Sequence, residues 1–252
     1  MTFPEWFDSK FGPHTPELYR EEVQRSSGQV KALRRILGEP DGAPVLDLCC
    51  GWGRHALPLA ALGYPVVGLD GSAYFLELLR SEDKMTTGRL PVLRGDMRRL
   101  PFVRGSFRAV YQMYTSFGYG DDPSDDRRVL SEVNRVLSPG GLYLLDLINW
   151  SLARRAFDGV YEDSYPEFDV VEDCRILPGD LLRMKRALLF RDGRPVHEYT
   201  FEIRMYDCQT LCDLALDSGL KFQDAWGDFR GTSYDPARSS RMILFFRRPG
   251  AA

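Results

Sequence analysis

The chain has 252 residues, 44% of them hydrophobic and 27% charged, with a formal net charge of −3 at pH 7. This composition excludes a disordered or fibrous protein and favours one large globular domain. The small negative charge provides no overall positive field, so no nucleic-acid partner is expected. No run of about 18 apolar residues occurs, which predicts a cytoplasmic protein without a membrane span.

The five cysteines are expected to be reduced thiols. Their odd count, without a recognisable secretion signal, argues against a disulfide framework. Cys208 and Cys212 are four residues apart, but no second cysteine or histidine pair has ligand spacing. We therefore predict no metal site.

The first 42 residues are expected to form a helical segment. Residues 15 to 38 carry apolar side chains at mostly helical spacing and end on Gly38, which suits a C-cap. From residue 43 the pattern changes, and short apolar runs alternate with helical patterns as far as residue 149. The strand-like runs are VLDLCC, PVVGLD, LPVLRGD, FRAVYQMY and LYLLDLIN. Strands joined by crossover helices run parallel, so the sequence predicts a doubly wound, Rossmann-like α/β sheet.

Two later segments complete the predicted architecture. Residues 160–206 contain the turn signals Pro178-Gly179-Asp180 and Asp192-Gly193 between strand-like runs, which predicts an inserted antiparallel β subdomain. Residues 207–252 then give a helix ending near Gly219 and two strands, which we expect to form an antiparallel hairpin on the main sheet. The predicted core domain is therefore 43–159 together with 207–252.

The first strand feeds a glycine turn, Cys49-Cys50-Gly51-Trp52-Gly53, that opens a helix. Such a turn lets the backbone approach a ligand, and the helix N-terminus favours negative groups. Asp70 ends the second strand, where a carboxylate can accept hydrogen bonds from both hydroxyls of a ribose. Asp96, with the apolar Met97 beside it, follows the third strand where an adenine would lie. The residues thus predict an adenosine site.

Four motifs in this order, VLDLCCGWGRH, VVGLDGS, GDM and EVNRVLSPGGLYLLD, resemble those of class I S-adenosylmethionine-dependent methyltransferases. The resemblance covers about residues 43 to 149. It departs from the family's D-x-G-x-G-x-G pattern at one position, because Cys49 stands where the first glycine is usual. The resemblance implies a methyltransferase fold, S-adenosyl-L-methionine as cofactor and S-adenosyl-L-homocysteine as product.

The resemblance also implies roles for individual residues. Asp47 would be the acidic residue before the turn, and Cys50, Gly51 and Gly53 would line the methionine moiety. Asp70 would bind the ribose, flanked by Gly71 and Ser72, and Asp96 with Met97 would hold the adenine. The N-terminal segment of residues 1–42 would act as a lid, with Tyr19 near the cofactor, although its aromatic residues could equally form a hydrophobic plug.

The loop after the fourth strand should face the transferred methyl group, because ligands bind at the carboxyl ends of parallel strands. Tyr114, Tyr119 and Trp150 are therefore candidates for the substrate pocket, against plain core packing. No general base can be assigned: His14, His55 and His197 are the only histidines, and each also fits a surface or packing role. Family members that methylate adenine or amide nitrogens carry an Asn/Asp-Pro-Pro-Tyr-like tetrad in this loop, and this chain does not have it.

Several functions remain open at this stage. The leading hypothesis is a methyltransferase for a small-molecule substrate, with a nitrogen, oxygen or carbon acceptor. The alternatives are an NAD-dependent dehydrogenase, since Gly51, Gly53, Ala56 and Asp70 also satisfy a dinucleotide fingerprint, a non-catalytic binding module, and a methyltransferase for RNA or protein. The inserted sheet could serve as a lid or as the interface of a homodimer.

Overall fold

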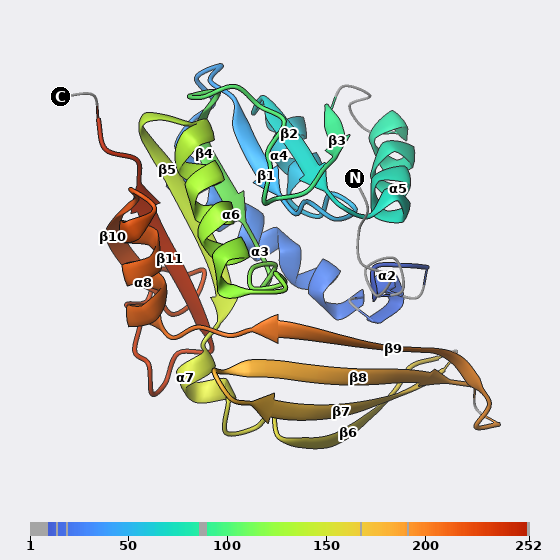
Figure 1. Cartoon of the computed structure of the whole chain (residues 1–252). Coiled ribbons are helices and arrows are strands. Elements are labelled where there is room, and N and C mark those ends of the chain that lie inside the picture. Colours follow the sequence, from blue (N-terminus) through green and yellow to red (C-terminus); the bar gives the residue numbers. More distant parts are fainter. Residues whose placement is uncertain are drawn as a thin grey trace.

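The computed structural model (Figure 1) describes residues 10–13, 15–18, 20–85, 90–166, 168–190 and 192–250. Its larger sheet has the strand order β10-β11-β5-β4-β1-β2-β3. The strands are β1 (Val45–Leu48), β2 (Val66–Asp70), β3 (Val92–Arg94), β4 (Phe107–Gln112), β5 (Leu137–Ile148), β10 (Lys221–Trp226) and β11 (Arg241–Arg247). Strands β1 to β5 pair in parallel, and β11 pairs antiparallel with β5 and β10. The predicted α/β class with an antiparallel C-terminal hairpin is confirmed.

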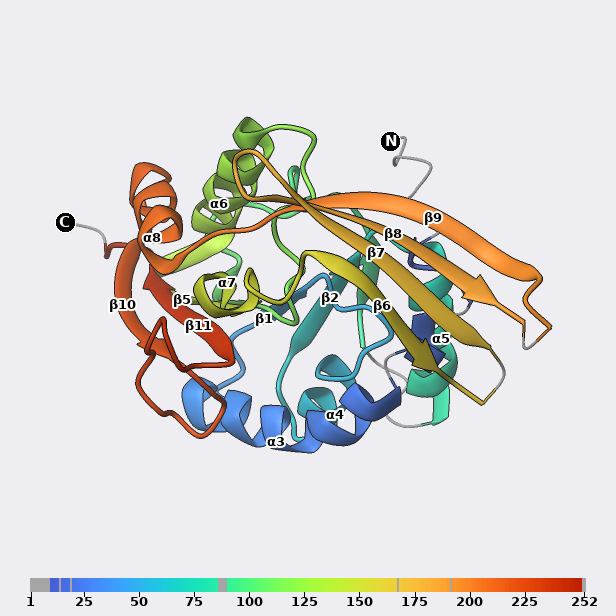
Figure 2. The same ribbon diagram turned by 90° about the horizontal axis from the view of Figure 1, so that it is seen from below.

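Helices cover both faces of this sheet (Figure 2). One face carries α6 (Pro123–Val136) and α8 (Cys208–Asp217), and the other carries α3 (Arg20–Leu37), α4 (Ala56–Ala61) and α5 (Ala73–Met85). Strand β1 contributes to both cores: Leu46 and Leu48 face the first group of helices, and Val45 faces the second. A strand buried on both sides requires mostly apolar side chains, which Val45, Leu46 and Leu48 supply, and Asp47 is the charged exception within β1.

The second sheet is antiparallel, with the strand order β6-β7-β8-β9. Its strands are β6 (Gly159–Ser164), β7 (Asp169–Leu177), β8 (Leu181–Leu189) and β9 (Pro195–Arg204). A short helix, α7 (Trp150–Ala153), leads into it from β5. Along β9, Tyr199, Phe201 and Ile203 are buried, as the alternating pattern predicts. The sheet lies across one end of the large sheet (Figures 1 and 2), where the Arg204 N–H donates to the Gly118 carbonyl, at 2.8 Å.

Two boundaries differ from the sequence prediction. The helix predicted over residues 15–38 is described as α2 (Thr15–Leu18) and α3, with Tyr19 between them outside the described residues. Strand β5 begins at Leu137, so it includes the Pro139-Gly140-Gly141 run that we expected to precede it. A register shift against β4 between Phe107 and Ala109 accommodates that run. Within the described residues, no helix combines the length and apolar character needed to cross a bilayer.

Candidate active site

The turn after β1 has an unusual backbone. Cys49, Gly51 and Gly53 all have positive φ, at 63°, 55° and 86°. A side chain on Gly53 would also place its Cβ 2.9 Å from a leucine of α5, so this glycine is needed for packing. Gly51 has open space around the same position, its nearest neighbour being Phe75 at 3.9 Å. Cys49 adopts the left-handed conformation without being glycine, at a cost of about 1 kcal/mol.

Asp70, at the end of β2, faces this turn. Its Oδ2 accepts the Gly51 N–H and its Oδ1 accepts the Ser72 N–H, each at 2.8 Å. Burial raises the pKa of Asp70, and the hydrogen bonds from the N–H groups of Ser72, Gly51 and Gly71 counter that rise. A carboxylate has about four lone-pair sites, so Asp70 can still accept hydrogen bonds from a ligand.

A cavity opens where β1 to β4 end. Counting its open mouth, it holds about 1250 Å³ of atom-free space. Its walls include residues 49–52, 69–71, 95–98, 113–116 and 119–121. Phe11 and Thr15, from the N-terminal segment, also line it. The Phe11 carbonyl accepts a hydrogen bond from Ser72 Oγ at 2.8 Å, and its ring lies 5.8 Å from that of Phe75. The N-terminal segment is therefore docked against the cavity, at the sheet edge expected for a ligand site.

The wall formed by the loop after β4 is strained. Tyr114 and Thr115 have φ of 61° and 57°, and Thr115 is β-branched, which makes this conformation especially unfavourable. Asp146 of β5 holds the loop: its Oδ2 accepts the Tyr114 N–H and its carbonyl the Thr115 N–H, both at 2.9 Å. Arg241 of β11 donates from its Nε to Asp146 Oδ1 at 2.8 Å, and its Nη2 forms an ion pair with the same oxygen at 2.8 Å.

Asp146 and Arg241 were missed by sequence reasoning. The available signal was a single carboxylate in the otherwise apolar strand LYLLDLI. Asp146 is 1% exposed, and a buried carboxylate requires a partner that the local sequence does not provide.

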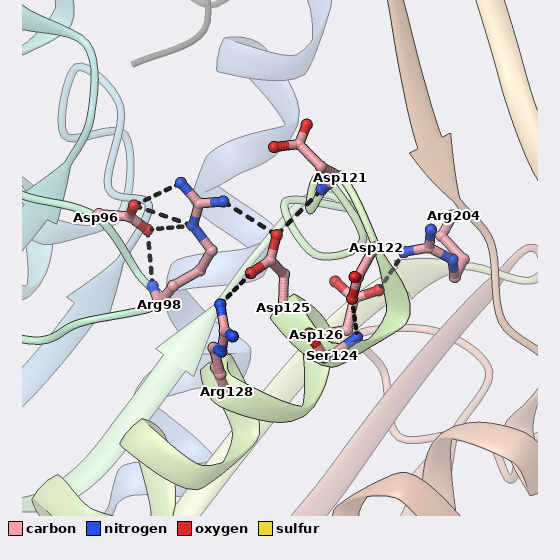
Figure 3. A network of polar contacts seen from close by, with 9 residues as sticks. All are labelled: Asp96, Arg98, Asp121, Asp122, Ser124, Asp125, Asp126, Arg128 and Arg204. Atoms are coloured by element: carbon pink, nitrogen blue, oxygen red, sulfur yellow. Dashed lines mark hydrogen bonds and ion pairs between the residues drawn. The ribbon is translucent and has the colours of Figure 1, made fainter. Parts of the chain in front are cut away.

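Asp96, the predicted adenine ligand, is already engaged by Arg98 (Figure 3). The Arg98 N–H donates to Asp96 Oδ1 at 2.8 Å, and its guanidinium contacts both carboxylate oxygens at 2.8 to 3.1 Å. Arg98 also reaches Asp125 at the start of α6, at 3.1 Å. The next residue, Asp126, pairs with Arg204 of the small sheet at 2.9 Å. These charges connect the cavity wall after β3 to the small sheet through the N-terminus of α6.

Two buried titratable groups lie behind the turn. Asp47 is 1% exposed, its Oδ2 has no hydrogen-bond partner among the residues that the structure describes, and burial raises its pKa to about 8. His55 begins the following turn of helix, lines the cavity and shares a 2.7 Å hydrogen bond with Gln29 through its Nε2. Burial lowers the pKa of His55 to about 3, so its imidazole is neutral and packed in place.

The structure brings most of the predicted site residues to one cavity. Among those predicted to contact the cofactor, the ones in its lining are Cys50, Gly51, Asp70, Gly71, Asp96 and Met97. Three stand behind the lining and support it, namely Asp47, Gly53 and Ser72. Tyr19 and His14 lie outside the described residues. The same holds for Phe3, Trp6 and Phe7, which are among the aromatic residues of the predicted lid or plug.

The three substrate-pocket candidates separate. Tyr114 and Tyr119 line the cavity. Trp150 is 1% exposed and belongs to the core beneath the small sheet, where its indole N–H donates to Asp180 at 3.0 Å. The structure thus places Trp150 in a hydrophobic core and not in the pocket wall, because α7 directs the chain toward the small sheet immediately after β5.

Known proteins resemble the chain in both sequence and fold. The family model of a methyltransferase domain matches residues 45–141. A demethylmenaquinone methyltransferase of Lactococcus lactis is 36% identical over 123 residues, which cover 47% of this chain and 46% of that enzyme, so the chain spans about half the length of this relative. The putative methyltransferase YqeM of Bacillus subtilis is 33% identical over 212 residues, 82% of this chain and 84% of the relative.

A solved structure shows the same architecture. An amino pentose methyltransferase of Micromonospora echinaspora, solved with bound S-adenosylmethionine, superposes with a TM-score of 0.64 at 22% identity. The superposition covers 91% of each chain, so it includes the small sheet as well as the large one.

Proposed function

This chain belongs to the class I S-adenosylmethionine-dependent methyltransferases, and we propose that it methylates a small molecule bound in the cavity at the carboxyl ends of β1 to β4. S-Adenosylmethionine is the cofactor, which removes the dehydrogenase alternative. The observation that carries the proposal is Asp70, fixed by the N–H groups of Gly51 and Ser72 in the lining of the cavity. This is the arrangement that a nucleoside needs at the carboxyl edge of a parallel sheet.

The residues present fit the cofactor. Asp70 would accept hydrogen bonds from the two ribose hydroxyls, and the turn at Cys50 and Gly51 would hold the methionine part. The unpartnered Oδ2 of buried Asp47 supports this placement, because an orphaned acceptor behind the turn suits a cationic amine or a water bound to it. The adenine would lie along Met97, and Asp96 could accept its amine only by sharing oxygens with Arg98.

When bound, the cofactor would supply an electrophilic methyl group on a sulfonium, open to attack by an acceptor atom in line with the carbon–sulfur bond. The chain's task is then to align the acceptor and exclude water. The loop after β4 is positioned for this task, since residues 113–116 line the cavity and Asp146 fixes their strained backbone. In a non-catalytic binding module we would expect this loop to block the site. Here the loop lines the cavity and leaves it accessible, which argues against that alternative.

The covered cavity favours a small acceptor over a polymer. Phe11 and Thr15 close one side, and Tyr119 lies 6.2 Å from Phe201 of the small sheet, measured between ring centroids. An RNA or protein substrate needs an open groove, and the net charge of −3 offers no attraction to RNA. The small sheet and the N-terminal segment would therefore define the size of the acceptor.

Thermal unfolding with S-adenosylhomocysteine and, separately, with NADH tests the proposal. A ligand at about 100 times its Kd stabilises the folded state by about 2.7 kcal/mol, so S-adenosylhomocysteine should raise Tm progressively as its concentration exceeds Kd. The shift should be lost in Asp70→Ala and retained in Asp217→Asn, an exposed aspartate on α8. A shift with NADH alone would overturn the proposed function.

A further inference from the structure

Lys10 places a buried amine beside the cavity. The residue is 3% exposed, and its Nζ lies over three aromatic rings, 3.3 Å from the centroid of Phe201, 4.1 Å from that of Tyr119 and 5.1 Å from that of Phe11. The Nζ also donates a hydrogen bond to the Tyr119 hydroxyl. We call these three rings the aromatic box.

A row of polar side chains lies next to the box on the small sheet. Glu172, Arg186 and Tyr199 occupy facing positions on β7, β8 and β9. Arg186 is 8% exposed, pairs with Glu172 and donates to the Tyr199 hydroxyl at 2.9 Å. Burial lowers the pKa of Lys10 well below its usual value, Arg186 lowers it further, and Glu172 opposes that effect. The ring faces therefore attract an ammonium group, while burial and Arg186 make its proton easier to lose.

The box shares a wall with the cofactor cavity. Phe11 and Tyr119 border the cavity and also contact Lys10, which lies outside its lining. Phe201 connects the same group to the small sheet, since its ring lies 6.2 Å from that of Tyr119. Lys10 enters this space from the N-terminal segment and is not part of either sheet. Its side chain can therefore leave the box without unpairing a strand.

We propose that the aromatic box is the acceptor subsite, that it takes an aliphatic amine, and that Lys10 fills it until an acceptor displaces the side chain. This inference rests on the proposed function and specifies its substrate class. Ring faces attract an ammonium group, and a box already built around one amine fits another of the same size. A hydroxyl or carbon acceptor carries no positive charge, so it would lack the attraction of the ring faces for an ammonium group.

The same surroundings suit the chemistry of an amine acceptor. An alkylammonium has no lone pair, so it must first lose a proton to solvent or to a nearby base. The neutral nitrogen then forms the new bond to the methyl carbon while the carbon–sulfur bond breaks and sulfur keeps the electron pair. The positive charge thus moves from sulfur to nitrogen, and the product ammonium can release a further proton. A site that lowers the pKa of Lys10 would favour the first of these steps.

The first experiment truncates the Lys10 side chain and adds a free amine of the same size as the part removed. Lys10→Ala leaves a space that n-propylammonium matches atom for atom, and 1-propanol is a neutral probe of similar size. We expect n-propylammonium to bind Lys10→Ala saturably, at least about fivefold more tightly than 1-propanol, by NMR titration and Tm shift at constant ionic strength. Adding Phe201→Leu should weaken that binding severalfold. Wild type and Lys185→Ala, which alters an exposed lysine of β8, should bind it much more weakly than Lys10→Ala, because the probe must first displace the Lys10 side chain.

A second variant keeps the test decisive if Lys10→Ala is unstable. Lys10→Met fills the box with a neutral side chain, so it should fold and should not bind n-propylammonium. In an unstable Lys10→Ala, n-propylammonium must raise Tm toward that of Lys10→Met while 1-propanol must not. Equal effects of the two probes, or no effect of either, would show that Lys10 is only a packing residue and would overturn the inference.

A methyl-transfer assay connects the box to the reaction. Release of S-adenosylhomocysteine is measured with a panel of primary alkylamines and the matching alcohols. We expect transfer to amines only, with Phe201→Leu raising KM for the amine more than it lowers kcat. Transfer to alcohols alone would overturn the inference and leave the proposed function standing. If wild type did not bind S-adenosylhomocysteine, the proposed function itself would be overturned.

Discussion

The two sides of the cavity are built in different ways. On the cofactor side, Asp70 accepts hydrogen bonds from Gly51 and Ser72, which lie 19 and 2 residues away in the sequence. On the side that we propose for the acceptor, here called the acceptor side, the corresponding contacts span much longer stretches of chain. Lys10 reaches Tyr119 across 109 residues, and Asp146 reaches Arg241 across 95. The first side is a local motif, whereas the second exists only when distant strands and the N-terminal segment have come together.

This difference separates binding from specificity. A site made by one turn and the end of the next strand forms whenever that βαβ unit folds, so its geometry depends little on the rest of the chain. A site assembled from β5, β11, β9 and the N-terminal segment can change with each of them. Variants on the acceptor side should therefore cost more stability or alter the substrate, while variants on the cofactor side should act on binding and on protonation.

The largest effect is expected from Asp146→Ala. The substitution leaves Arg241, whose side chain is 21% exposed, without its carboxylate and releases the strained backbone at Tyr114 and Thr115. Breaking a buried pair from one side costs about 3–5 kcal/mol. Urea unfolding measures the loss, and Glu202→Ala serves as the matched control because its pair with Arg183 is largely exposed and worth about 0–1 kcal/mol. Equal losses in the two variants would show that Asp146 does not hold the loop.

The predictability of the molecule follows the same division. Alternating apolar and helical runs, the turn at Gly51 and the position of Asp70 are local patterns, and they were enough to predict the parallel sheet, the cofactor family and the cavity edge. Pairing partners of isolated charges are not local, so Arg241 could not be assigned to Asp146. The placement of Trp150 depended on the direction of the chain after β5, which no short motif encodes.

Asp96 lies at the predicted position, but its carboxylate has a partner that the sequence prediction did not include. The prediction placed it after β3, beside Met97, and both residues do line the cavity. Its carboxylate, however, is occupied by Arg98, two residues further on, which also pairs with Asp125 of α6 (Figure 3). The local sequence contains Arg98, but only the arrangement of α6 shows that its guanidinium bridges two aspartates.

The next effect lies on the cofactor side and depends on pH. Burial raises the pKa of Asp47 from 3.8 to about 8, so the folded protein resists ionising this group. Its favourable contribution is complete below about pH 4 and is lost as the pH rises toward and through 8. We expect Asp47→Asn to stabilise the ligand-free protein by at least about 2 kcal/mol at pH 8 and by little at pH 4.

Urea unfolding of wild type and Asp47→Asn between pH 4 and 9 measures this difference. Asp224→Asn, which changes an exposed aspartate of β10, controls for the loss of one negative charge. A difference between wild type and Asp47→Asn that stays constant with pH would mean that folding does not raise the pKa of Asp47. The same variant should bind S-adenosylhomocysteine more weakly, since the resemblance places Asp47 next to the methionine moiety.

The smallest effect concerns Cys49, whose backbone belongs to the cofactor side while its Sγ lies 3.9 Å from the Ser116 carbonyl on the acceptor side. Cys49→Ala and Cys49→Gly both remove this thiol and differ only in Cβ. Because φ is 63°, the glycine variant should be about 1 kcal/mol more stable than the alanine variant.

At Cys50, whose φ is not positive, we expect the alanine variant to be more stable than the glycine variant. The reason is that glycine has the greater conformational entropy in the unfolded chain. Thermal and urea unfolding of the four variants therefore separate backbone strain from thiol packing. If alanine were the better residue at both positions, the turn would tolerate Cys49 without strain, and the departure from the glycine pattern would have no energetic cost on the cofactor side.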